Sequence, residues 1–474
     1  MNLIGRKAEQ VTFKHLMQST ESKLVAVYGR RRMGKTFLIR QYFDKKLSFE
    51  IVGLHNGTIR DQLDNFVQTL VRHGYAEAMV AKPSSWMEAF QLFSLYINSL
   101  KGTGKKVIFF DELPWFDTPR SRFLMAFEHF WNAYCTRRSD ILLIICGSSA
   151  SWMIKKILQN KGGLHNRVSE KMKINPFTLI EAQAFFLKKG IKWSMYDIAQ
   201  FYMIAGGIPY YLDAVRKGES VTQCIDRLCF QKSGLLYDEF EELYSSLFDN
   251  SEIHKKLILT LASFPSGLTR DKLIAQSGIL SGGYLTKAID ELESAGFVSI
   301  KTPYGAKYNK AEYKIDDFFT LFYMKFMRSK SGRQQESWTK LVKNQSWVSW
   351  SGFAFERLCY AHIENIKNAL GLGVIQAEIY NWKSRDEHDG AQIDLIIDRA
   401  DGIINICEIK FAGSEFIIDK TCAGNLRNKM DTFSRLVKKK ILFLTMVTTF
   451  GTRNNEYYKE LVQSEVTLED LFGK

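Results

Sequence analysis

A short segment near the start of the chain has the residue types and spacing of a loop that holds phosphate groups. Gly29, Gly34, Lys35 and Thr36 form the series Gly-x4-Gly-Lys-Thr. Glycines let backbone N–H groups turn toward phosphate oxygens, and the N-terminus of a following helix adds positive potential. Lysine at this position reaches the β- and γ-phosphates of a nucleoside triphosphate, and the threonine hydroxyl is a ligand for Mg²⁺. The other residues of the predicted nucleotide-binding segment are Arg30, Arg31, Arg32, Met33 and Phe37.

Three consecutive arginines in this loop also fit a basic patch for a polyanion such as nucleic acid. The apolar segment KLVAVYG before the loop and the helix-like segment FLIRQYF after it favour the nucleotide site, because a P-loop joins a strand to a helix. We expect the arginine side chains to point away from the phosphates, toward carboxylates or a partner, since backbone amides hold the phosphate oxygens.

Two carboxylates follow a second apolar segment, VIFFDE. Asp111 is predicted to hold the Mg²⁺ shell, and Glu112 to polarise a water molecule as general base. Ser148 ends a third apolar segment, LLIICGSS. The carboxyl ends of parallel strands meet at one edge of a sheet, so the Ser148 hydroxyl is predicted beside the phosphates. The alternative for Ser148 is a cap for the following helix.

Apolar segments at residues 23–29, 47–53, 105–112 and 140–149 alternate with amphipathic helical patterns. Continuous apolar strands separated by helices predict a parallel sheet covered on both faces, an α/β fold. We assign residues 1–170 to this core. Residues 171–250 have all-helical patterns and form the next predicted segment.

Six sequence motifs resemble those of the archaeal-type P-loop ATPases, a family in the STAND branch of the AAA+-like ATPases. The motifs are LIGRKAEQ, YGRRRMGKTFLI, FFDELPW, ICGSSASWM, NRVSEKMKINPFT and GGIPYYL. The resemblance covers about residues 1–250 and implies ATP as the nucleotide, with Mg²⁺, and a helical lid at 171–250. It places Gly5 and Arg6 near the adenine. It also implies that Arg167 contacts the γ-phosphate, in cis or from a neighbouring subunit; a surface ion pair is the alternative.

Residues 251–325 predict three short helices followed by a hairpin and resemble a winged helix. The segment expected to form the recognition helix is SGGYLTKAIDELESAGF. It carries three acids and one lysine, whereas a helix that reads bases needs Arg, Lys, Asn or Gln. The predicted wing, KTPYGAKYNKAEYK, is rich in lysine and suits phosphate contacts. The alternatives are therefore DNA binding and an intramolecular spacer or regulatory module. Residues 326–347 are polar and predict a connector.

A second set of residues that could do chemistry lies in the last predicted segment, 348–474. Glu356 is on a predicted helix, Asp394 is on a predicted strand at 391–398, and Glu408 and Lys410 are on the next strand, at 402–411. The i, i+2 spacing puts Glu408 and Lys410 on one face of their strand. Carboxylates that share a divalent metal beside a lysine suit phosphodiester hydrolysis. The alternative is an ordinary exposed charge pair on β-strands.

This segment, with further strands predicted at 374–381 and 440–447, resembles the PD-(D/E)xK nuclease fold. It is similar to the domain of unknown function that is often fused to archaeal-type ATPases. The motifs FAFERLCY, AQIDLIID and ICEIKF carry the resemblance, and a basic KKK run lies at 438–440. Ile393 stands where the family has proline before the aspartate. The resemblance implies Glu356, Asp394 and Glu408 as metal ligands and Lys410 as a catalytic residue.

Composition limits the class of protein. The chain has 474 residues, 46% of them hydrophobic, so it can form several cores. Lys plus Arg is 65 and Asp plus Glu is 51, a net charge of +14, which favours anionic partners. We find no apolar run long enough for a membrane span and no secretion signal. The seven cysteines form no CxxC pair, so we expect a reducing, cytoplasmic location and no membrane partner.

The leading hypothesis is an ATP-binding and ATP-hydrolysing switch coupled to a nuclease-like, DNA-directed domain. The alternative is an ATP-regulated DNA-binding or scaffolding protein whose C-terminal domain is catalytically inactive. A sequence-specific transcription factor is a third reading, which the acidic recognition segment disfavours. A homo-oligomer or a partner protein is compatible with the family resemblance, because an arginine supplied in trans requires a neighbouring subunit.

Overall fold

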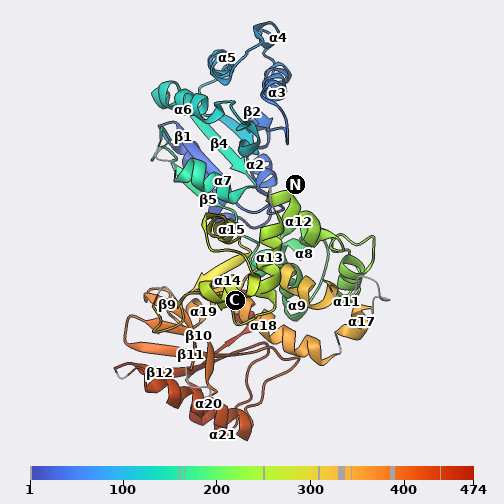
Figure 1. The fold of residues 1–474 in the computed structure, drawn as a ribbon, viewed down its shortest axis with the longest axis vertical. Helices are drawn as coiled ribbons and strands as arrows, with labels where there is room; N and C mark the ends of the chain where they lie inside the picture. Colours follow the sequence, from blue (N-terminus) through green and yellow to red (C-terminus); the bar gives the residue numbers. More distant parts are fainter. Residues whose placement is uncertain are drawn as a thin grey trace. The chain divides into compact units, whose positions relative to one another are not determined.

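The computed structural model describes residues 3–159, 162–164, 166–248, 251–307, 310–328, 337–342, 344–384, 390–437 and 439–473 (Figure 1). The chain divides into two compact units, Met1–Pro176 and Phe177–Lys474. Parts of the predicted connector (329–336 and 343), of the predicted wing (308–309) and of the basic run (438) lie outside the described residues.

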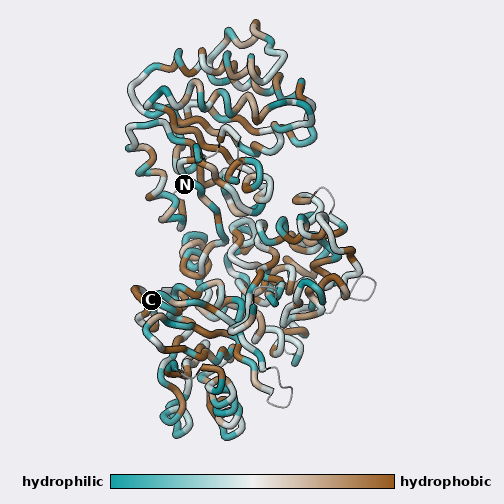
Figure 2. The backbone as a smooth tube through the Cα atoms, turned by 60° about the vertical axis from the view of Figure 1, so that its left-hand side comes forward, coloured by the Kyte–Doolittle hydropathy of each residue, from teal (hydrophilic) through white to brown (hydrophobic). Residues whose placement is uncertain are grey.

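The first unit is built on a five-stranded parallel sheet with the order β2-β3-β4-β1-β5. All residues of β3 and β4 are buried, and Figure 2 shows the hydrophobic character of these strands. The four predicted strands and the α/β class are confirmed. The fifth strand, β5, falls inside the segment predicted as helical, because its sequence EKMK lacks an apolar run. The strands are β1 (Lys23–Tyr28), β2 (Leu47–Val52), β3 (Lys106–Asp111), β4 (Ile141–Gly147) and β5 (Glu170–Lys173).

Helices of the first unit pack on the sheet through an aromatic core. The ring centroids of Phe49 on β2 and Phe93 on α5 are 4.6 Å apart, and Phe90 stacks on Phe130 of α6 at 4.9 Å. Each fully buried phenylalanine contributes about 1.5–3 kcal/mol. The helices are α1 (Lys7–Gln18), α2 (Lys35–Phe43), α3 (Ile59–Arg72), α4 (Ala78–Ala81), α5 (Trp86–Ser99), α6 (Phe123–Ala133) and α7 (Ala150–Trp152).

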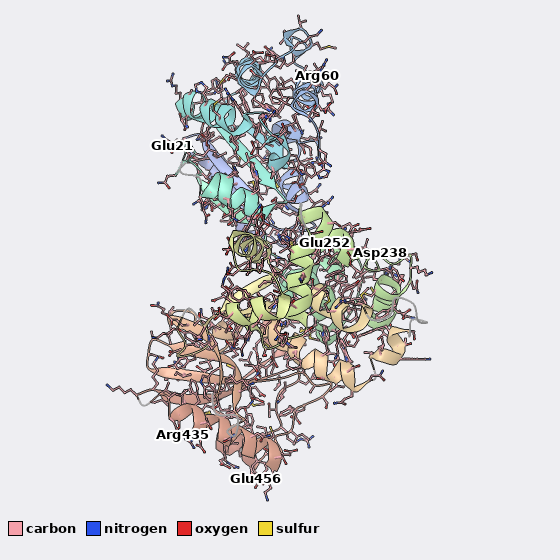
Figure 3. All side chains as sticks on the ribbon, viewed as in Figure 1. Glu21, Arg60, Asp238, Glu252, Arg435 and Glu456 are labelled. Carbon is pink, nitrogen blue, oxygen red and sulfur yellow. The ribbon has the colours of Figure 1, made fainter. Side chains whose placement is uncertain are left out.

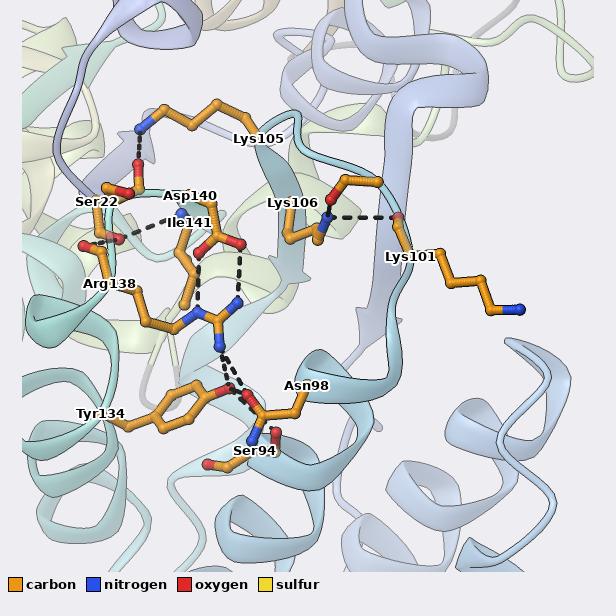
Figure 4. Close-up of polar contacts among 12 residues, drawn as sticks. Ser22, Ser94, Asn98, Lys101, Lys105, Lys106, Tyr134, Arg138, Asp140 and Ile141 are labelled. Carbon is orange, nitrogen blue, oxygen red and sulfur yellow. Dashed lines mark hydrogen bonds and ion pairs between the residues drawn. The ribbon is translucent and has the colours of Figure 1, made fainter.

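Polar contacts join the segments that enter β1, β3 and β4 (Figure 4). The Ser22 hydroxyl donates to the carbonyl of Arg138 at 2.8 Å, and the Arg138 guanidinium forms an ion pair with Asp140 at 2.8 Å. Lys105 donates to the carbonyl of Ser139 at 2.9 Å. The amino ends of the strands are therefore fixed by structural contacts, so the opposite, carboxyl edge is the edge available for a ligand.

The second unit begins with a group of helices. α9 packs on α8, α11 and α16, and also on α18 and α22 of the C-terminal part of the same unit. Trp338, in the predicted connector, is buried in α17 against Phe230 and Phe322. The described part of the connector is thus a packed helix. The helices are α8 (Leu179–Lys188), α9 (Met195–Ala205), α10 (Pro209–Asp213), α11 (Val221–Ile225), α12 (Glu239–Leu247), α16 (Phe318–Phe322) and α17 (Trp338–Leu341).

Between α12 and α16 lie three helices and a small sheet with the order β6-β8-β7. β8 pairs antiparallel with both neighbours, so the predicted hairpin is present and gains one short strand. The helices pack through Leu257, Leu273 and Leu285, which are buried. The elements are α13 (Ser251–Ala262), β6 (Leu268–Thr269), α14 (Arg270–Ser277), α15 (Gly283–Ser294), β7 (Val298–Lys301) and β8 (Glu312–Ile315).

The C-terminal part contains a mixed five-stranded sheet with the order β13-β12-β11-β10-β9. β9, β10 and β11 are antiparallel, whereas β11, β12 and β13 are parallel. The four predicted strands are present; β13 was not predicted. The elements are α18 (Gln345–Ala361), α19 (Ile363–Ala369), β9 (Ala377–Lys383), β10 (Gln392–Arg399), β11 (Ile403–Lys410), α20 (Lys420–Ser434), β12 (Ile441–Thr448), α21 (Glu456–Leu461), β13 (Ser464–Thr467) and α22 (Leu468–Leu471).

Charged side chains cover the surface of both units. Figure 3 labels six exposed ones: Glu21, Arg60, Asp238, Glu252, Arg435 and Glu456. All seven cysteines are free thiols, as the sequence predicts. Among the described helices, none is long and apolar enough to cross a membrane.

Candidate functional site

The predicted phosphate loop connects the end of β1 to the start of α2. Gly29 has φ +143°, and a Cβ atom there would lie 2.6 Å from the backbone oxygen of Ile174. Gly34, which precedes α2, has φ +77°. Both positions favour glycine because L side chains rarely adopt these φ values. The two glycines of the motif are thus explained by backbone conformation and close packing.

The spacing of the motif brings Lys35 and Thr36 to the carboxyl edge of the sheet. The Lys35 side chain is buried, and its Nζ donates to the carbonyl oxygens of Gly29 at 2.8 Å and Arg30 at 3.0 Å. The Thr36 hydroxyl donates to Asp111 Oδ2 at 2.7 Å. The structure therefore brings the loop lysine, the loop threonine and the first predicted carboxylate together.

Glu112 adopts a left-handed backbone conformation, with φ 49° and ψ 52°. Its carboxylate Oε2 accepts hydrogen bonds from the backbone N–H of Ser148 at 2.9 Å and from the Ser148 hydroxyl at 2.8 Å. A non-glycine residue is uncommon in this region and is held there by its surroundings. The backbone strain and the two hydrogen bonds fix the position of this carboxylate beside Asp111.

Ser148 is not the N-cap of the helix that follows it. The following helix, α7, begins at Ala150, and its N-cap is Ser149, which makes no side-chain capping bond. Ser148 contacts Glu112 instead. Nearby, burial and then the Asp111 carboxylate raise the pKa of the Cys146 thiol, so this side chain stays neutral.

The N-terminal stretch contacts the loop. Arg6, which is buried, donates from Nη1 to the carbonyl of Asn175 at 2.6 Å and from Nη2 to the carbonyl of Met33 at 3.2 Å. Gln10 holds the preceding residue by donating to the carbonyl of Gly5 at 2.7 Å. The predicted pair Gly5 and Arg6 is therefore part of the same site as the phosphate loop.

The remaining residues of the predicted segment differ in exposure. Arg30 and Met33 are buried, Arg32 is half-buried, and Arg31 and Phe37 are exposed. Arg167 is exposed and lies between α7 and β5. Among the described residues, no acidic side chain forms an ion pair with Arg167, and the structure does not bring it into contact with the loop.

In the C-terminal sheet, Glu408 is the residue with the strongest ionic contacts. Its Oε1 lies 2.8 Å from Nζ of Lys410, and its Oε2 lies 2.7 Å from Nζ of Lys429. The Glu408 side chain is 9% exposed. Burial would raise the pKa of this carboxyl, but Lys429 and Lys410 together hold the pKa below its usual value.

Glu356 and Asp394 lie beside Glu408. Burial, followed by repulsion from Asp394 and Glu408, raises the pKa of Glu356 to about 8. Asp394 Oδ1 accepts a hydrogen bond from Gln392 at 2.7 Å, and the Tyr360 hydroxyl donates to the backbone carbonyl of Asp394 at 2.6 Å. The Glu356 carboxyl therefore lies within reach of the charges of Asp394 and Glu408.

The predicted metal set of Glu356, Asp394 and Glu408 is not gathered into one ligand cluster. Within the described part of the chain, no three His, Cys, Asp or Glu side chains could hold a metal ion together. The physical reason is visible at Glu408, because two ammonium groups occupy its two oxygens. Sequence reasoning missed Lys429, although its place on a polar face of the helix after the Glu-x-Lys strand was a usable signal.

Comparison with known proteins agrees with the geometry of the first site. Residues 3–215 match the model of an ATPase domain predominantly from Archaea. An uncharacterized protein of Methanocaldococcus jannaschii is 25% identical over 397 residues, which cover 83% of each chain. The chain therefore contains an archaeal-type ATPase domain.

One solved structure has a similar fold. The Walker-type ATPase of Pyrococcus abyssi is 17% identical, with a TM-score of 0.51, covering 68% of this chain and 96% of that one. A STAND protein with a tetratricopeptide repeat sensor from Pyrococcus horikoshii is 16% identical and covers 78% of this chain and 48% of that one. Its TM-score is 0.33, so only the first similarity bears on the fold. The parallel sheet is thus that of a P-loop NTPase.

Proposed function

We propose that this protein is a switch that binds and hydrolyses ATP at the loop between β1 and α2. The observation that carries the proposal is the contact of Thr36 with Asp111, 2.7 Å long, next to the buried Lys35. A hydroxyl and a carboxylate oxygen side by side are the donors that Mg²⁺ prefers. Thr36 and Asp111 would hold this ion, which neutralises phosphate charge when ATP is bound.

Lys35 is the residue that would recognise the triphosphate. Its ammonium group is now satisfied by two neutral carbonyl oxygens of its own loop. Phosphate oxygens accept stronger, charge-assisted hydrogen bonds, so the ammonium would exchange the carbonyls for the β- and γ-phosphates. The loop N–H groups and the start of α2 supply the remaining positive potential.

Glu112 is proposed as the general base, and Ser148 as the residue that positions it. The two hydrogen bonds from Ser148 leave Glu112 Oε1 as the oxygen to take a proton from water. Arg6, through its contact with the Met33 carbonyl, is proposed to connect the adenine side of the site to the loop. Arg167 is proposed as an arginine finger, from the same chain or from a second copy.

The test of nucleotide binding is titration of the full-length protein with a fluorescent ATP analogue. Lys35→Ala is expected to weaken binding by about 10- to 100-fold, the range for loss of a hydrogen bond to a charged group. Arg31→Ala, which removes an exposed cation of the same loop, is the matched control. Equal losses in the two variants would mean that the loop attracts polyanions through net charge and is not a nucleotide site.

The proposed domains are the ATPase core at 1–170, a helical lid at 171–250, a winged helix at 251–325, a connector at 326–347 and a nuclease-like domain at 348–474. The three helices α13, α14 and α15, followed by the hairpin of β7 and β8, support the winged helix. The mixed sheet, with α18 before it and Glu408 and Lys410 on β11, supports the last domain.

One contact favours an intramolecular role for the winged helix over DNA binding through its wing. Tyr304, in the turn between β7 and β8, donates from its backbone N–H to the carbonyl of Asn381 on β9 at 2.8 Å. Its ring contacts the rings of Tyr380 and Phe433 at 5.3 and 5.2 Å. The wing turn is therefore occupied by the C-terminal sheet and α20, and we propose that it transmits movement to them.

A second candidate function, an activity directed at DNA, is proposed for the C-terminal domain. The observation in its favour is the group of Glu356, Asp394, Glu408 and Lys410 around β10 and β11. In their present arrangement these residues do not fit a divalent metal, because Glu408 is bound at both oxygens by lysines. We therefore assign no step to a metal here.

One experiment distinguishes a DNA-cleaving role of this domain from a DNA-binding or scaffolding role. Plasmid DNA is incubated with the protein and Mg²⁺ or Mn²⁺, with and without ATP, and the DNA forms are resolved on a gel. Nicking by the wild type that Lys410→Ala abolishes would establish an active nuclease. Equal inertness of both proteins on all DNA forms would favour the ATP-regulated binding or scaffolding role.

A further inference from the structure

A cavity of about 570 Å³ lies beside Glu408, between the end of β11 and helix α20. Glu408, Lys410 and Lys429 form one side of this cavity. Three polar residues of α20 line it as well: Thr421, Asn425 and Asn428. The chemical groups around the space are thus two ammonium groups, two carboxylates, side-chain amides, a hydroxyl and a thiol, with apolar side chains among them.

The sequence of α20 explains why one face of this helix is polar. Thr421, Asn425 and Lys429 follow one another at four-residue intervals, which places them in a row along the helix. Ala423, Leu426 and Phe433 of the same helix are buried in the core of the C-terminal sheet, and Phe433, one further four-residue step along, ends the polar row. The polar row is about 12 Å long, from a rise of 1.5 Å per residue. It is therefore longer than a single phosphate group requires.

The formal charges of the side chains that line the cavity balance, because Lys410 and Lys429 stand against Glu408 and Asp419. Glu408 contributes one negative charge and the two lysines contribute two positive charges. The other acid that lines the cavity, Asp419, is exposed and accepts the N–H of Cys422 at 2.8 Å as the N-cap of α20. An anion can approach the ammonium groups from the cavity, because the side chains of Lys410 and Lys429 remain 36% and 19% exposed.

We propose that the polar face of α20 binds the phosphate backbone of a DNA strand, and that Lys429 exchanges between Glu408 and a strand phosphate. In the free protein Lys429 neutralises Glu408; with a strand in the cavity its ammonium binds the phosphate, and Lys410 remains on Glu408. This inference rests on the proposed DNA-directed function of the C-terminal domain. It adds a residue outside the Glu-x-Lys motif and explains why the acids do not gather around a metal.

Two properties of Lys429 fit this exchange. Its long flexible stem lets the ammonium group turn between neighbouring acceptors, which the planar fork of an arginine does less readily. Its present ion pair occupies the oxygen of Glu408 that Lys410 does not contact. Moving the ammonium to a phosphate therefore frees one oxygen of Glu408 without removing its last counter-charge.

The first test measures strand binding without turnover. A fluorescent DNA duplex is titrated with the full-length protein in Ca²⁺ at several salt concentrations, and anisotropy gives Kd. Lys429→Met is expected to weaken binding about tenfold and to lower the slope of log K against log salt by about one. Lys429→Arg should restore most of the affinity. Lys459→Met, an exposed lysine on α21 outside the cavity, is the matched control.

Equal affinity and equal salt slope for the wild type and Lys429→Met would overturn the strand site. Inorganic phosphate is the competitor that tests where the DNA contact lies. Displacement of DNA by millimolar phosphate to the same extent from the wild type and from Lys429→Met would place the phosphate contact away from Lys429 and would also overturn the proposal. Circular dichroism of each variant confirms that the fold is retained.

The second test asks, in the absence of DNA, whether Lys429 keeps one oxygen of Glu408 from binding a cation. Binding of Mn²⁺ is measured by electron paramagnetic resonance for the wild type, Lys429→Met and Lys429→Met/Glu408→Gln. We expect one additional Mn²⁺ per chain in the single variant and loss of this ion in the double variant. Equal Mn²⁺ binding by all three proteins would overturn the exchange. Neither readout depends on DNA cleavage, so an inert nuclease assay would leave this inference standing.

Discussion

The two sites of this protein use the same kinds of side chain in opposite ways. Each has a lysine and carboxylates at the ends of neighbouring strands. In the first unit, Lys35 is held by neutral carbonyl oxygens, while Asp111 and Glu112 accept hydrogen bonds from hydroxyl groups. In the second unit, Lys410 and Lys429 form ion pairs with Glu408 directly.

This difference bears on how each site would take a ligand. A cation or a carboxylate that is held by neutral partners loses only ordinary hydrogen bonds when it is released, which suits the phosphate and the divalent cation proposed for the first site. A half-buried ion pair holds its charges more strongly, and breaking it leaves an uncompensated charge. The second site therefore needs a ligand that replaces one lysine before its carboxylate becomes available.

The largest expected effect is the loss of ATP turnover when the proposed general base, Glu112, is replaced. Glu112→Gln keeps the shape of the side chain and an oxygen that can accept from Ser148, but it removes the carboxylate that would take the proton. ATP turnover should fall by about 10²- to 10⁴-fold. The measurement is phosphate release at saturating ATP, compared with nucleotide affinity, which should change less than threefold.

The control for this variant is Asp117→Asn, because Asp117 is an acid in the same sheet-edge segment that is not assigned to the site. A drop in nucleotide affinity of Glu112→Gln as large as its drop in turnover would contradict a role in the chemical step.

The second prediction concerns the stability of the fold at the second site and its dependence on pH. The pKa of Glu356 is raised from 4.5 in the unfolded chain to about 8 in the folded one, mainly by burial. The protonated carboxyl therefore contributes stability that is complete below about pH 4.5 and is lost as pH rises through 8.

Glu356→Gln should remove this part of the pH dependence. Urea unfolding followed by tryptophan fluorescence, at pH 5.5 and pH 8.5, gives the change in free energy for each protein. The wild type should lose more stability than the variant between these two values. A parallel loss in both proteins would show that Glu356 does not titrate with the raised pKa that its burial and its acidic neighbours produce.

The smallest expected effect concerns the residue that positions the base. Ser148→Ala removes the hydroxyl bond to Glu112 but keeps the bond from the backbone N–H. ATP turnover should fall by about fivefold, which corresponds to about 1 kcal/mol, the typical value of one hydrogen bond. Ser149→Ala is the neighbouring control. A loss for Ser148→Ala as large as that of Glu112→Gln would indicate that Ser148 acts directly on the nucleotide.

Most of the first unit could be predicted from the sequence. Continuous apolar runs mark β1 to β4, and the strand-loop-helix context of Lys35 identifies the phosphate loop. β5 could not be found in this way because its four residues lack an apolar run; it exists because Val25 to Tyr28 offer a free edge for pairing. Ser148 was predicted to lie near the site, but its contact with Glu112 required the left-handed turn of that residue.

Less of the second unit could be predicted. The alternation of helix and strands indicated the C-terminal sheet, and the i, i+2 spacing correctly put Glu408 and Lys410 on one face. The sequence gives no distance between α20 and β11, so the ion pair from Lys429 was missed. The connector seemed polar because most of its residues are, although Trp338 anchors its described part in a core.

The sequence by itself determined the local features: which segments form strands and helices, where the phosphate loop begins, and which strand carries the Glu-x-Lys pair. These follow from periodicity and from glycine, which act over a few residues. Only the tertiary structure decided how charges are paired. Whether Lys429 neutralises Glu408, or whether the wing turn at Tyr304 is occupied, depends on contacts between segments distant in the chain, and side-chain electrostatics acts through space.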